Sequence, residues 1–194
     1  MVRTVCLFFP VCVSLVAERP HIRRFNDHIY YGKQPNKEEF TNLARVGIKT
    51  VLDLRGGRIH KPRDEKRVEA AGMQYISIRL SGLFPPKDAQ IVSVLAVLED
   101  PTRQPVFVHC WRGVDRVGLV LACYRIAHDH WLNKQALAEA RRDGLNPVEL
   151  LLQRYIRHFD PARVGVATSR SADWRTAGKL PALPPEAAGT RSTR

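Results

Sequence analysis

Hydrophobic residues along this chain occur in short runs whose spacing alternates between that of strands and that of helices. Four apolar or β-prone runs predict strands, at residues 28–31, 48–54, 75–80 and 106–108. The segments between them carry apolar side chains at helical spacing, which predicts helices at residues 37–46, 62–71 and 87–100. Strands that alternate with helices indicate an α/β fold, with a largely parallel central sheet of about four to five strands flanked by helices. The run at 28–31 alternates only weakly, which favours an edge strand.

The pattern after the fourth strand is helical. From Val117 to Ala127 nearly every residue is apolar, so this helix is expected in the middle of the domain. Asn133 is predicted to cap a further helix that ends at Gly144. A last helix is predicted to start at residues 146–147. Its expected core stripe consists of Leu150, Leu151, Tyr155, Ile156 and Phe159.

The two ends of the chain differ from this pattern. Residues 4–17 form an uncharged, mostly apolar run between Arg3 and Glu18. Because the run is too short for a membrane span, residues 1–17 predict a signal peptide and export to the periplasm or the medium. The alternative is an N-terminal apolar segment that is retained as a buried strand or an uncleaved anchor, with the uncleaved chain in the cytoplasm. Residues 164–194 lack periodicity and predict a disordered basic tail.

Composition changes this picture little. The 194 residues are 44% hydrophobic and 26% charged, which is typical of one soluble domain with extensions. The net charge of +12 favours anionic partners. No nucleic-acid motif or interleaving of aromatic and basic residues accompanies the charge, so no specific nucleic acid is expected. The mature chain is expected to have no stable membrane span, and its oligomeric state is left open.

The cysteines are not spaced as a disulfide or zinc framework. After residue 17 only Cys110 and Cys123 remain, and the helical rise between them keeps the two thiols too far apart for a disulfide. Cys123 is predicted to be a small buried residue. His128 and His130 lie near a helix end, where histidines cap the helix or face solvent more often than they bind metal. We therefore expect no metal site and no cofactor.

Candidate chemistry concentrates in residues 105–118. A buried strand ends near His109, an apolar helix follows Arg116, and Gly113 lies in the turn between them. Backbone N–H groups of such a strand-to-helix loop converge at the positive end of the helix and form an anion site. Cys110 in this loop is favoured as a thiolate by the helix N-terminus and by Arg116. A nucleophile at the base of an anion site is suited to attack on a phosphate.

The motif resembles that of a known enzyme family. His109 and Cys110, followed after five residues by Arg116, are similar to the His-Cys-x5-Arg signature of the cysteine-dependent protein tyrosine phosphatases. The Asp115-Arg116 ending and the compact length resemble the small dual-specificity-like phosphatases of bacteria and fungi. The likeness extends from about Ile29 to about Asp160.

This resemblance implies a phosphotyrosine-phosphatase-like fold, with residues 18–163 as a dual-specificity-phosphatase-like catalytic domain. It also implies a metal-independent phosphomonoesterase that hydrolyses phosphotyrosine, phosphoserine, phosphothreonine or another phosphate monoester through a phosphocysteine intermediate. The substrate is then a phosphorylated protein or another phosphate monoester.

The resemblance also implies roles for the motif residues. Cys110 is the nucleophile, Arg116 binds two phosphate oxygens, and His109 supports the loop and favours the thiolate. Gly113 lets the backbone turn tightly. The phosphate-binding loop is expected to consist of Trp111, Arg112, Gly113, Val114, Asp115 and Arg116.

The leaving oxygen needs a proton, so a carboxylic acid is required. Asp115, beside Arg116, is the preferred candidate because related enzymes with this loop ending keep their acid there. Asp88, after the Pro85-Pro86 segment, is the alternative general acid. A negative charge in the first turn of a helix is also a sufficient structural reason for Asp88.

One position departs from the family. The residue after the arginine is usually Ser or Thr, whose hydroxyl stabilises the departing thiolate, whereas Val117 cannot donate a hydrogen bond. This departure leaves a weakly active, phosphate-binding pseudophosphatase as an alternative. The basic Trp111-Arg112 pair leaves a phosphoinositide phosphatase as another. A rhodanese-like sulfurtransferase is disfavoured, because the strand-His-Cys-x5-Arg context matches the phosphatases better.

Two further groups of charged residues have structural and functional interpretations. Asp53 and Arg55 end a predicted strand, and a structural salt bridge with Asp64 or Glu65 is preferred over a catalytic role. The segment 56–63 is interpreted as a surface loop. Four basic residues there either receive an anionic substrate or are simply solvated: Arg58, His60, Lys61 and Arg63.

Overall fold

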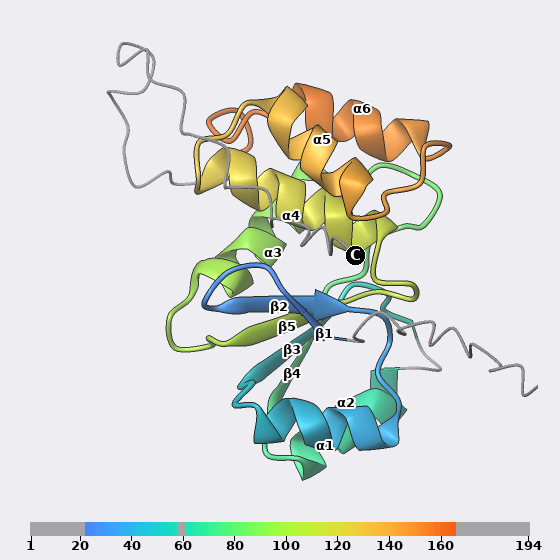
Figure 1. Cartoon of the computed structure of the whole chain (residues 1–194), viewed down its shortest axis with the longest axis vertical. Helices are drawn as coiled ribbons and strands as arrows, with labels where there is room; N and C mark the ends of the chain where they lie inside the picture. The colour runs from blue at the N-terminus through green and yellow to red at the C-terminus, as the bar shows by residue number, and fades with distance from the viewer. Residues whose placement is uncertain (1–21, 58–60, 166–194) are drawn as a thin grey trace, which may run out of the picture.

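A five-stranded sheet forms the middle layer of the protein (Figure 1). The computed structural model describes residues 22–57 and 61–165. The strands lie in the order β1-β2-β5-β3-β4, and every neighbouring pair is parallel except β1 and β2. Their bounds are β1 Ile22–Arg24, β2 Ile29–Gly32, β3 Thr50–Asp53, β4 Gln74–Ser77 and β5 Val106–His109. The predicted α/β fold with a largely parallel sheet is confirmed.

The four predicted strands correspond to β2 to β5, but β1 was not predicted. The interpretation of residues 28–31 as an edge strand is wrong, because β1 pairs antiparallel with the outer side of β2. The third predicted strand, residues 75–80, is shorter in the structure and ends at Ser77. The strand that carries the motif, β5, lies at the centre of the sheet between β2 and β3.

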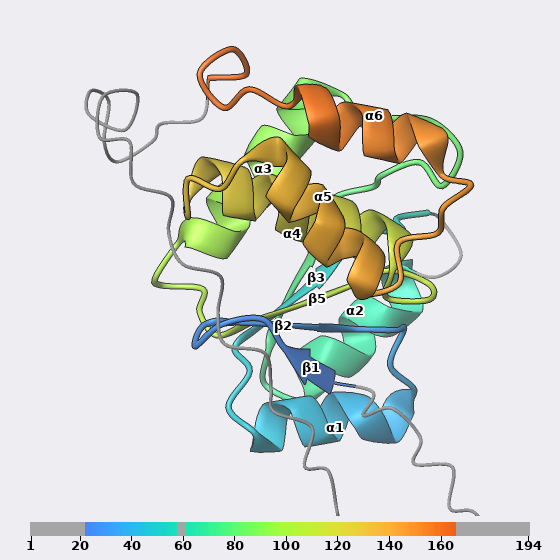
Figure 2. The same ribbon diagram turned by 45° about the horizontal axis from the view of Figure 1, so that its top comes forward.

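Helices cover both faces of the sheet (Figures 1 and 2). Two helices lie on one face: α1 Lys37–Arg45 and α2 Lys61–Ala70. Four lie on the other: α3 Asp88–Glu99, α4 Asp115–Ala127, α5 Asn133–Arg142 and α6 Leu150–His158. Successive side chains of a strand point to opposite faces, so Phe107 joins the core beneath α1 and α2, whereas Val106 and Val108 join the larger core beneath α3 to α6.

The helix that follows the motif is central, as its apolar sequence predicts. From Val117 to Tyr124 every residue of α4 is buried, and α3, α5 and α6 all pack against this helix. Cys123 is one of these residues and is completely buried, as predicted. The body of α4 is therefore fixed by packing against three other helices.

The predicted cap at Asn133 is wrong. Asn133 is the first residue of α5, whose N-cap is Leu132. The Asn133 amide instead donates hydrogen bonds of 2.8 Å to the carbonyls of Ile156 and Phe159. Asn133 thus caps the carboxyl end of α6, a contact between residues far apart in the sequence.

The last helix begins later than predicted, at Leu150. Residues 146–149 form a turn, so the predicted core stripe is only partly correct. Ile156 and Phe159 are buried, but Leu150 and Leu151 are 67% and 46% exposed. Burial is decided by how α6 packs against α4 and α5, and Leu152 takes the buried place.

The predicted leader, residues 1–17, lies outside the described residues, as does the predicted tail apart from Val164 and Gly165. Arg58 and His60 of the basic segment are also outside them. Among the residues that the structure describes, no helix is long and apolar enough to cross a membrane.

Candidate active site

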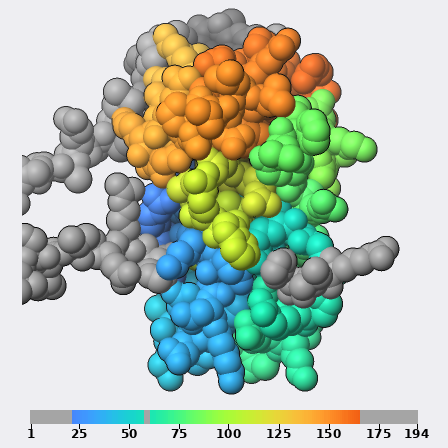
Figure 3. All heavy atoms as spheres, turned by 90° about the vertical axis from the view of Figure 1, so that its right-hand side faces the viewer, coloured from blue at the N-terminus to red at the C-terminus, as the bar shows by residue number. Residues whose placement is uncertain are grey.

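The segment between β5 and α4 forms a tight loop at the carboxyl end of the central strand. In the space-filling view it occupies the middle of one face, between the α5–α6 region and the segment that follows β4 (Figure 3). Cys110 begins the loop and is only 2% exposed. Its Sγ accepts a hydrogen bond from the backbone N–H of Gly113 at 3.2 Å. The thiol therefore lies beneath the loop, within reach of a backbone donor.

Gly113 is required for this turn. Its φ is +71°, in the left-handed region that favours glycine. A Cβ at this position would lie 2.2 Å from the carbonyl carbon of Gly32, so the loop packs directly on the backbone at the end of β2. The sequence-based role of Gly113 agrees with this geometry.

Five carbonyl groups of residues 109–114 accept hydrogen bonds from the protein. Because the N–H and C=O groups of a trans peptide point in opposite directions, holding these carbonyls on the protein turns the intervening N–H groups toward the other side of the loop. Backbone donors that converge in this way are what an anion site requires. The carbonyls and their donors are His109 with Leu54 N (2.9 Å), Cys110 with His109 Nδ1 (3.4 Å), Trp111 with Gln34 N (3.3 Å), Gly113 with Arg23 Nη2 (3.2 Å) and Val114 with Gly118 N (2.6 Å).

Arg116 lies in the first turn of α4 and is half-buried. Its guanidinium makes no hydrogen bond or ion pair with any other residue that the structure describes. All five of its N–H donors are thus free of partners in that part of the chain, and a guanidinium fork of this kind matches two phosphate oxygens. Val117 follows it and is completely buried.

His109 is completely buried beneath the loop. Burial lowers the pKa of His109 from 6.5 to about 4, although the charge of nearby Asp53 opposes the shift. The imidazole is therefore neutral at pH 7, and its hydrogen bond to the Cys110 carbonyl supports the loop without bringing a full positive charge to the thiol.

Asp115 is the first residue of α4, and both of its carboxylate oxygens accept hydrogen bonds. Oδ1 accepts from the backbone N–H of Asn146 at 3.0 Å, and Oδ2 accepts from Arg112 Nη2 at 2.7 Å. This ion pair raises the pKa of Arg112. Asp115 thus ties the loop to the turn between α5 and α6.

Asp88, the alternative acid, is the first residue of α3 and is half-exposed. Its Oδ1 accepts a hydrogen bond of 2.8 Å from the Tyr155 hydroxyl, and its Oδ2 lies 3.7 Å from Arg163 Nη2. The structure therefore gives Asp88 contacts with α6 and with the segment after α6, besides its position at a helix N-terminus.

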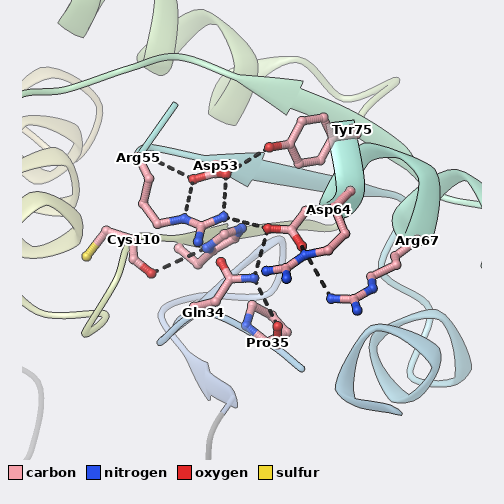
Figure 4. Close-up of polar contacts among 10 residues, drawn as sticks. Gln34, Pro35, Asp53, Arg55, Asp64, Arg67, Tyr75 and Cys110 are labelled. Atoms are coloured by element: carbon pink, nitrogen blue, oxygen red, sulfur yellow. Dashed lines mark hydrogen bonds and ion pairs between the residues drawn. The ribbon is translucent and has the colours of Figure 1, made fainter. Parts of the chain in front are cut away.

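A buried network of charges lies behind the loop (Figure 4). Arg55 lies between two carboxylates, with Nη2 2.8 Å from Asp53 Oδ2 and 2.7 Å from Asp64 Oδ2. Burial would raise the pKa of Asp53, but the hydrogen bonds from Arg55 and Tyr75 lower it overall. The prediction of a structural salt bridge between Asp53, Arg55 and Asp64 is confirmed.

The structure also brings residues to the loop that the sequence pattern did not indicate. Arg23 of β1 contacts the Gly113 carbonyl, and Asn146 contacts Asp115. No local spacing marks these contacts, because they join residues 90 and 31 positions apart. Among the residues that the structure describes, no cluster of three or more His, Cys, Asp or Glu side chains is arranged to hold a metal ion.

Comparison with known proteins places this chain in a family. A family model described as "DSP-PTPase phosphatase fused to NAD+ Kinase" matches residues 7–157. Dual specificity protein phosphatase TpbA of Pseudomonas aeruginosa (strain UCBPP-PA14) is 29% identical over 136 residues, which cover 70% of this chain and 60% of TpbA. Inositol diphosphatase DSP5 of Arabidopsis thaliana is 27% identical over 154 residues, which cover 75% of this chain and 72% of DSP5. The chain thus spans about three fifths of the length of TpbA.

Solved structures share the fold. The crystal structure of P. aeruginosa TpbA superposes with a TM-score of 0.65 at 26% identity, covering 77% of this chain and 91% of the chain in that crystal structure. The core catalytic domain of PP-IP phosphatase SIW14 from S. cerevisiae, in complex with citrate, gives a TM-score of 0.65 at 23% identity, covering 75% and 88%. Since the family model spans most of the chain, and solved structures of such phosphatases share its fold, the chain belongs to the DSP-PTPase family of cysteine-based phosphatases.

Proposed function

We propose that this chain is a metal-independent phosphomonoesterase that acts on a phosphorylated protein or another phosphate monoester through a phosphocysteine. The observation that carries the proposal is the geometry of residues 110–116. A buried thiol accepts a hydrogen bond from the Gly113 N–H, the carbonyls of the loop are turned onto the protein, and the Arg116 guanidinium is free to bind phosphate oxygens. The family membership supports the same chemistry.

In the first step the Cys110 thiolate attacks phosphorus, so that the S–P bond forms and the bond to the leaving oxygen breaks. The loop N–H groups and Arg116 bind the non-bridging oxygens, whose charge grows in the transition state. A carboxylic acid gives its proton to the leaving oxygen. In the second step water attacks phosphorus, the same carboxylate takes a proton from the water, and the S–P bond breaks to release phosphate and the thiolate.

Asp115 is the acid that we assign, with Asp88 as the alternative. Asp115 lies within the loop, but both of its oxygens accept hydrogen bonds from N–H groups, so one oxygen must be released before it can carry a proton. Arg112 is the partner that leaves more easily, because its side chain is 58% exposed and surface ion pairs are weak. An anionic substrate that draws Arg112 onto itself would free Oδ2 of Asp115.

Both oxygens of Asp115 accept hydrogen bonds, and this favours a second candidate substrate, a phosphate attached to another phosphate. The leaving group of such a diphosphate is a stabilised oxyanion that depends less on protonation than an alkoxide does. Relatives named inositol diphosphatases, such as DSP5, support this candidate. A phosphoinositide and a weakly active phosphate-binding role remain alternatives, the latter because of Val117.

Export of the chain belongs to the proposal as well, and the apolar run of residues 4–17 supports it. Expression of the full chain with a C-terminal tag in a bacterium, followed by N-terminal sequencing, tests it. A periplasmic product that begins at Glu18 is expected. A cytoplasmic product that retains Met1 would contradict export without affecting the proposed chemistry.

Hydrolysis of p-nitrophenyl phosphate in the presence of EDTA tests the reaction. The wild type is expected to be active, Cys110→Ser and Arg116→Lys to lose at least about 10³-fold in kcat/KM, and Cys123→Ala to keep its activity. Mass spectrometry of a quenched reaction is expected to find one added phosphoryl group on Cys110. Activity that survives in Cys110→Ser would refute the mechanism. Comparison of phosphotyrosine peptides, phosphoserine peptides and a diphosphorylated inositol then ranks the substrate classes.

A further inference from the structure

Arg23 contacts the back of the loop from a strand that lies outside the Cys-x5-Arg motif. Its Nη2 donates to the Gly113 carbonyl at 3.2 Å, and its Nη1 donates to the Asp143 carbonyl at 3.3 Å. The guanidinium carbon lies 4.4 Å from the centre of the Tyr31 ring. One cation therefore joins β1, β2, the loop and the carboxyl end of α5.

The orientation of the Gly113–Val114 peptide follows from this contact. A trans peptide is planar, and its C=O and N–H point in opposite directions. Because Arg23 holds the Gly113 carbonyl on the β1 side, the Val114 N–H is directed toward the opposite side of the loop. Because Gly113 has no side chain that restricts the adjoining backbone angles, the peptide that follows it needs a partner to fix its orientation.

Arg23 itself is fixed by two further residues. The Tyr31 hydroxyl donates to Asp143 Oδ2 at 3.0 Å, which holds the ring beneath the guanidinium. Burial, with the charge of Asp143, raises the pKa of Tyr31 to about 12, so the hydroxyl stays a donor at neutral pH. Asp143 is the C-cap of α5, where the helix dipole favours a cation.

We infer that Arg23 is a positioning residue for phosphate binding: it holds the Gly113–Val114 peptide with the N–H toward the phosphate. The inference rests on the proposed function of the loop. Arg23 touches neither the thiol nor the substrate in this role. It acts from behind the loop, opposite the side on which Arg116 would bind the phosphate.

Binding of inorganic phosphate, measured by calorimetry on the full chain, tests the inference. Arg23→Gln removes the charge and the paired donors, and is expected to raise the Kd of phosphate and the KM of p-nitrophenyl phosphate by about tenfold, with a smaller change in kcat. The matched control is Arg24→Gln. Arg24 is the exposed neighbour that, among the described residues, bonds with the Asn26 carbonyl and Asp27, and its change is expected to leave both constants unaltered.

The outcomes separate this inference from the proposed function. If the wild type neither binds phosphate nor hydrolyses the ester, the proposed function fails. If the wild type does both and Arg23→Gln binds phosphate equally well, with or without a lower melting temperature, Arg23 is only structural and the inference fails. If Arg23→Gln does not fold, the inference is tested in the wild type instead, by hydrogen exchange of the Val114 amide with and without phosphate. Phosphate must then protect the Val114 N–H, and an unprotected Val114 N–H would overturn the inference.

Discussion

Gly113 and Gly32 meet backbone to backbone, so closely that neither a side chain nor a water molecule fits between them. A Cβ on Gly113 would lie 2.2 Å from the Gly32 carbonyl carbon and 2.4 Å from both the Gly32 oxygen and the Lys33 nitrogen. The phosphate loop therefore rests on the end of β2, and its shape depends on a residue without a side chain.

We expect Gly113→Ala to abolish phosphate binding and to lower the free energy of unfolding by about 3 kcal/mol or more, because the loop must move and the positive φ is strained. Phosphate calorimetry and urea unfolding measure the two effects. Gly72→Ala is the matched control: Gly72 also has a positive φ, of +80°, but no atom lies within 4 Å of a Cβ there. The control should cost only about 1 kcal/mol of strain. Equal effects of the two changes would contradict the steric account.

Val117 predicts a slow second step. We expect rapid-mixing kinetics with p-nitrophenyl phosphate to give a burst of product followed by slow turnover. Val117→Thr should raise the steady-state rate tenfold or more, about 1.4 kcal/mol of barrier, because a hydroxyl then stabilises the departing thiolate. Val120→Thr makes the same chemical change at another fully buried position of α4 and should not raise the rate. A Val117→Thr variant that turns over no faster would refute this account.

The assignment of the acid predicts two different pH profiles. In Asp115→Asn we expect the profile of kcat/KM for a phosphoserine peptide to lose its basic limb, with a rate loss of about 10²-fold or more, because the alkoxide leaving group needs a proton. Asp88→Asn should keep the basic limb. A diphosphate substrate should be much less sensitive to Asp115→Asn, since its leaving group is already a stabilised anion. The reverse pattern for the two variants would assign the acid to Asp88.

The buried network behind the loop predicts a large loss of stability when its cation is removed. We expect Arg55→Met to cost about 3–5 kcal/mol in urea unfolding, because the buried Asp53 then loses its ion-pair partner and Asp64 keeps only the more distant Arg63 and Arg67, at 3.7 and 3.6 Å. Arg103→Met breaks an ion pair of Arg103 with Asp100 whose two side chains are partly exposed, and should cost far less. Similar losses in both variants would show that the buried pair is no stronger than the surface one.

His109 predicts a specific dependence of stability on pH. Its pKa falls from 6.5 to about 4 on folding, so the unfolded state binds one more proton between these values. The stability that the neutral imidazole contributes is therefore present above pH 6.5 and is lost as the pH falls toward 4, at about 1.4 kcal/mol per pH unit. Urea unfolding at pH 7 and at pH 5 measures this loss, which His109→Asn should lack. An equal loss in the variant would assign it to other groups.

Much of the fold could be predicted from local pattern. The apolar spacing of residues 37–46 predicted α1 correctly, and Asn36 starts this helix with a full capping box that it forms with Glu39. The uniformly apolar stretch after Arg116 also predicted a central helix, since a helix that is apolar on all sides is stable only when it is buried. These features are encoded within a few residues of one another.

Predictions failed where burial or pairing depended on a distant partner. β1 has only three residues, and its place at the edge is decided by pairing with β2. Asn133 looked like the cap of its own helix but caps α6, because the two helices lie side by side. Leu150 and Leu151 had the spacing of a core stripe, yet α6 starts later and turns another face inward.

The amino-acid sequence by itself determined the order of strands and helices and the loop from Cys110 to Arg116, because helix periods, turns and a strand-to-helix anion loop are set by neighbouring residues. It did not determine which groups hold that loop in shape. The contacts of Gly113 with Arg23 and of Asp115 with Asn146 join residues 90 and 31 positions apart. Only the packing of β1, α4 and α5 around the central strand brings these residues together. This packing cannot be predicted from the pattern of neighbouring residues.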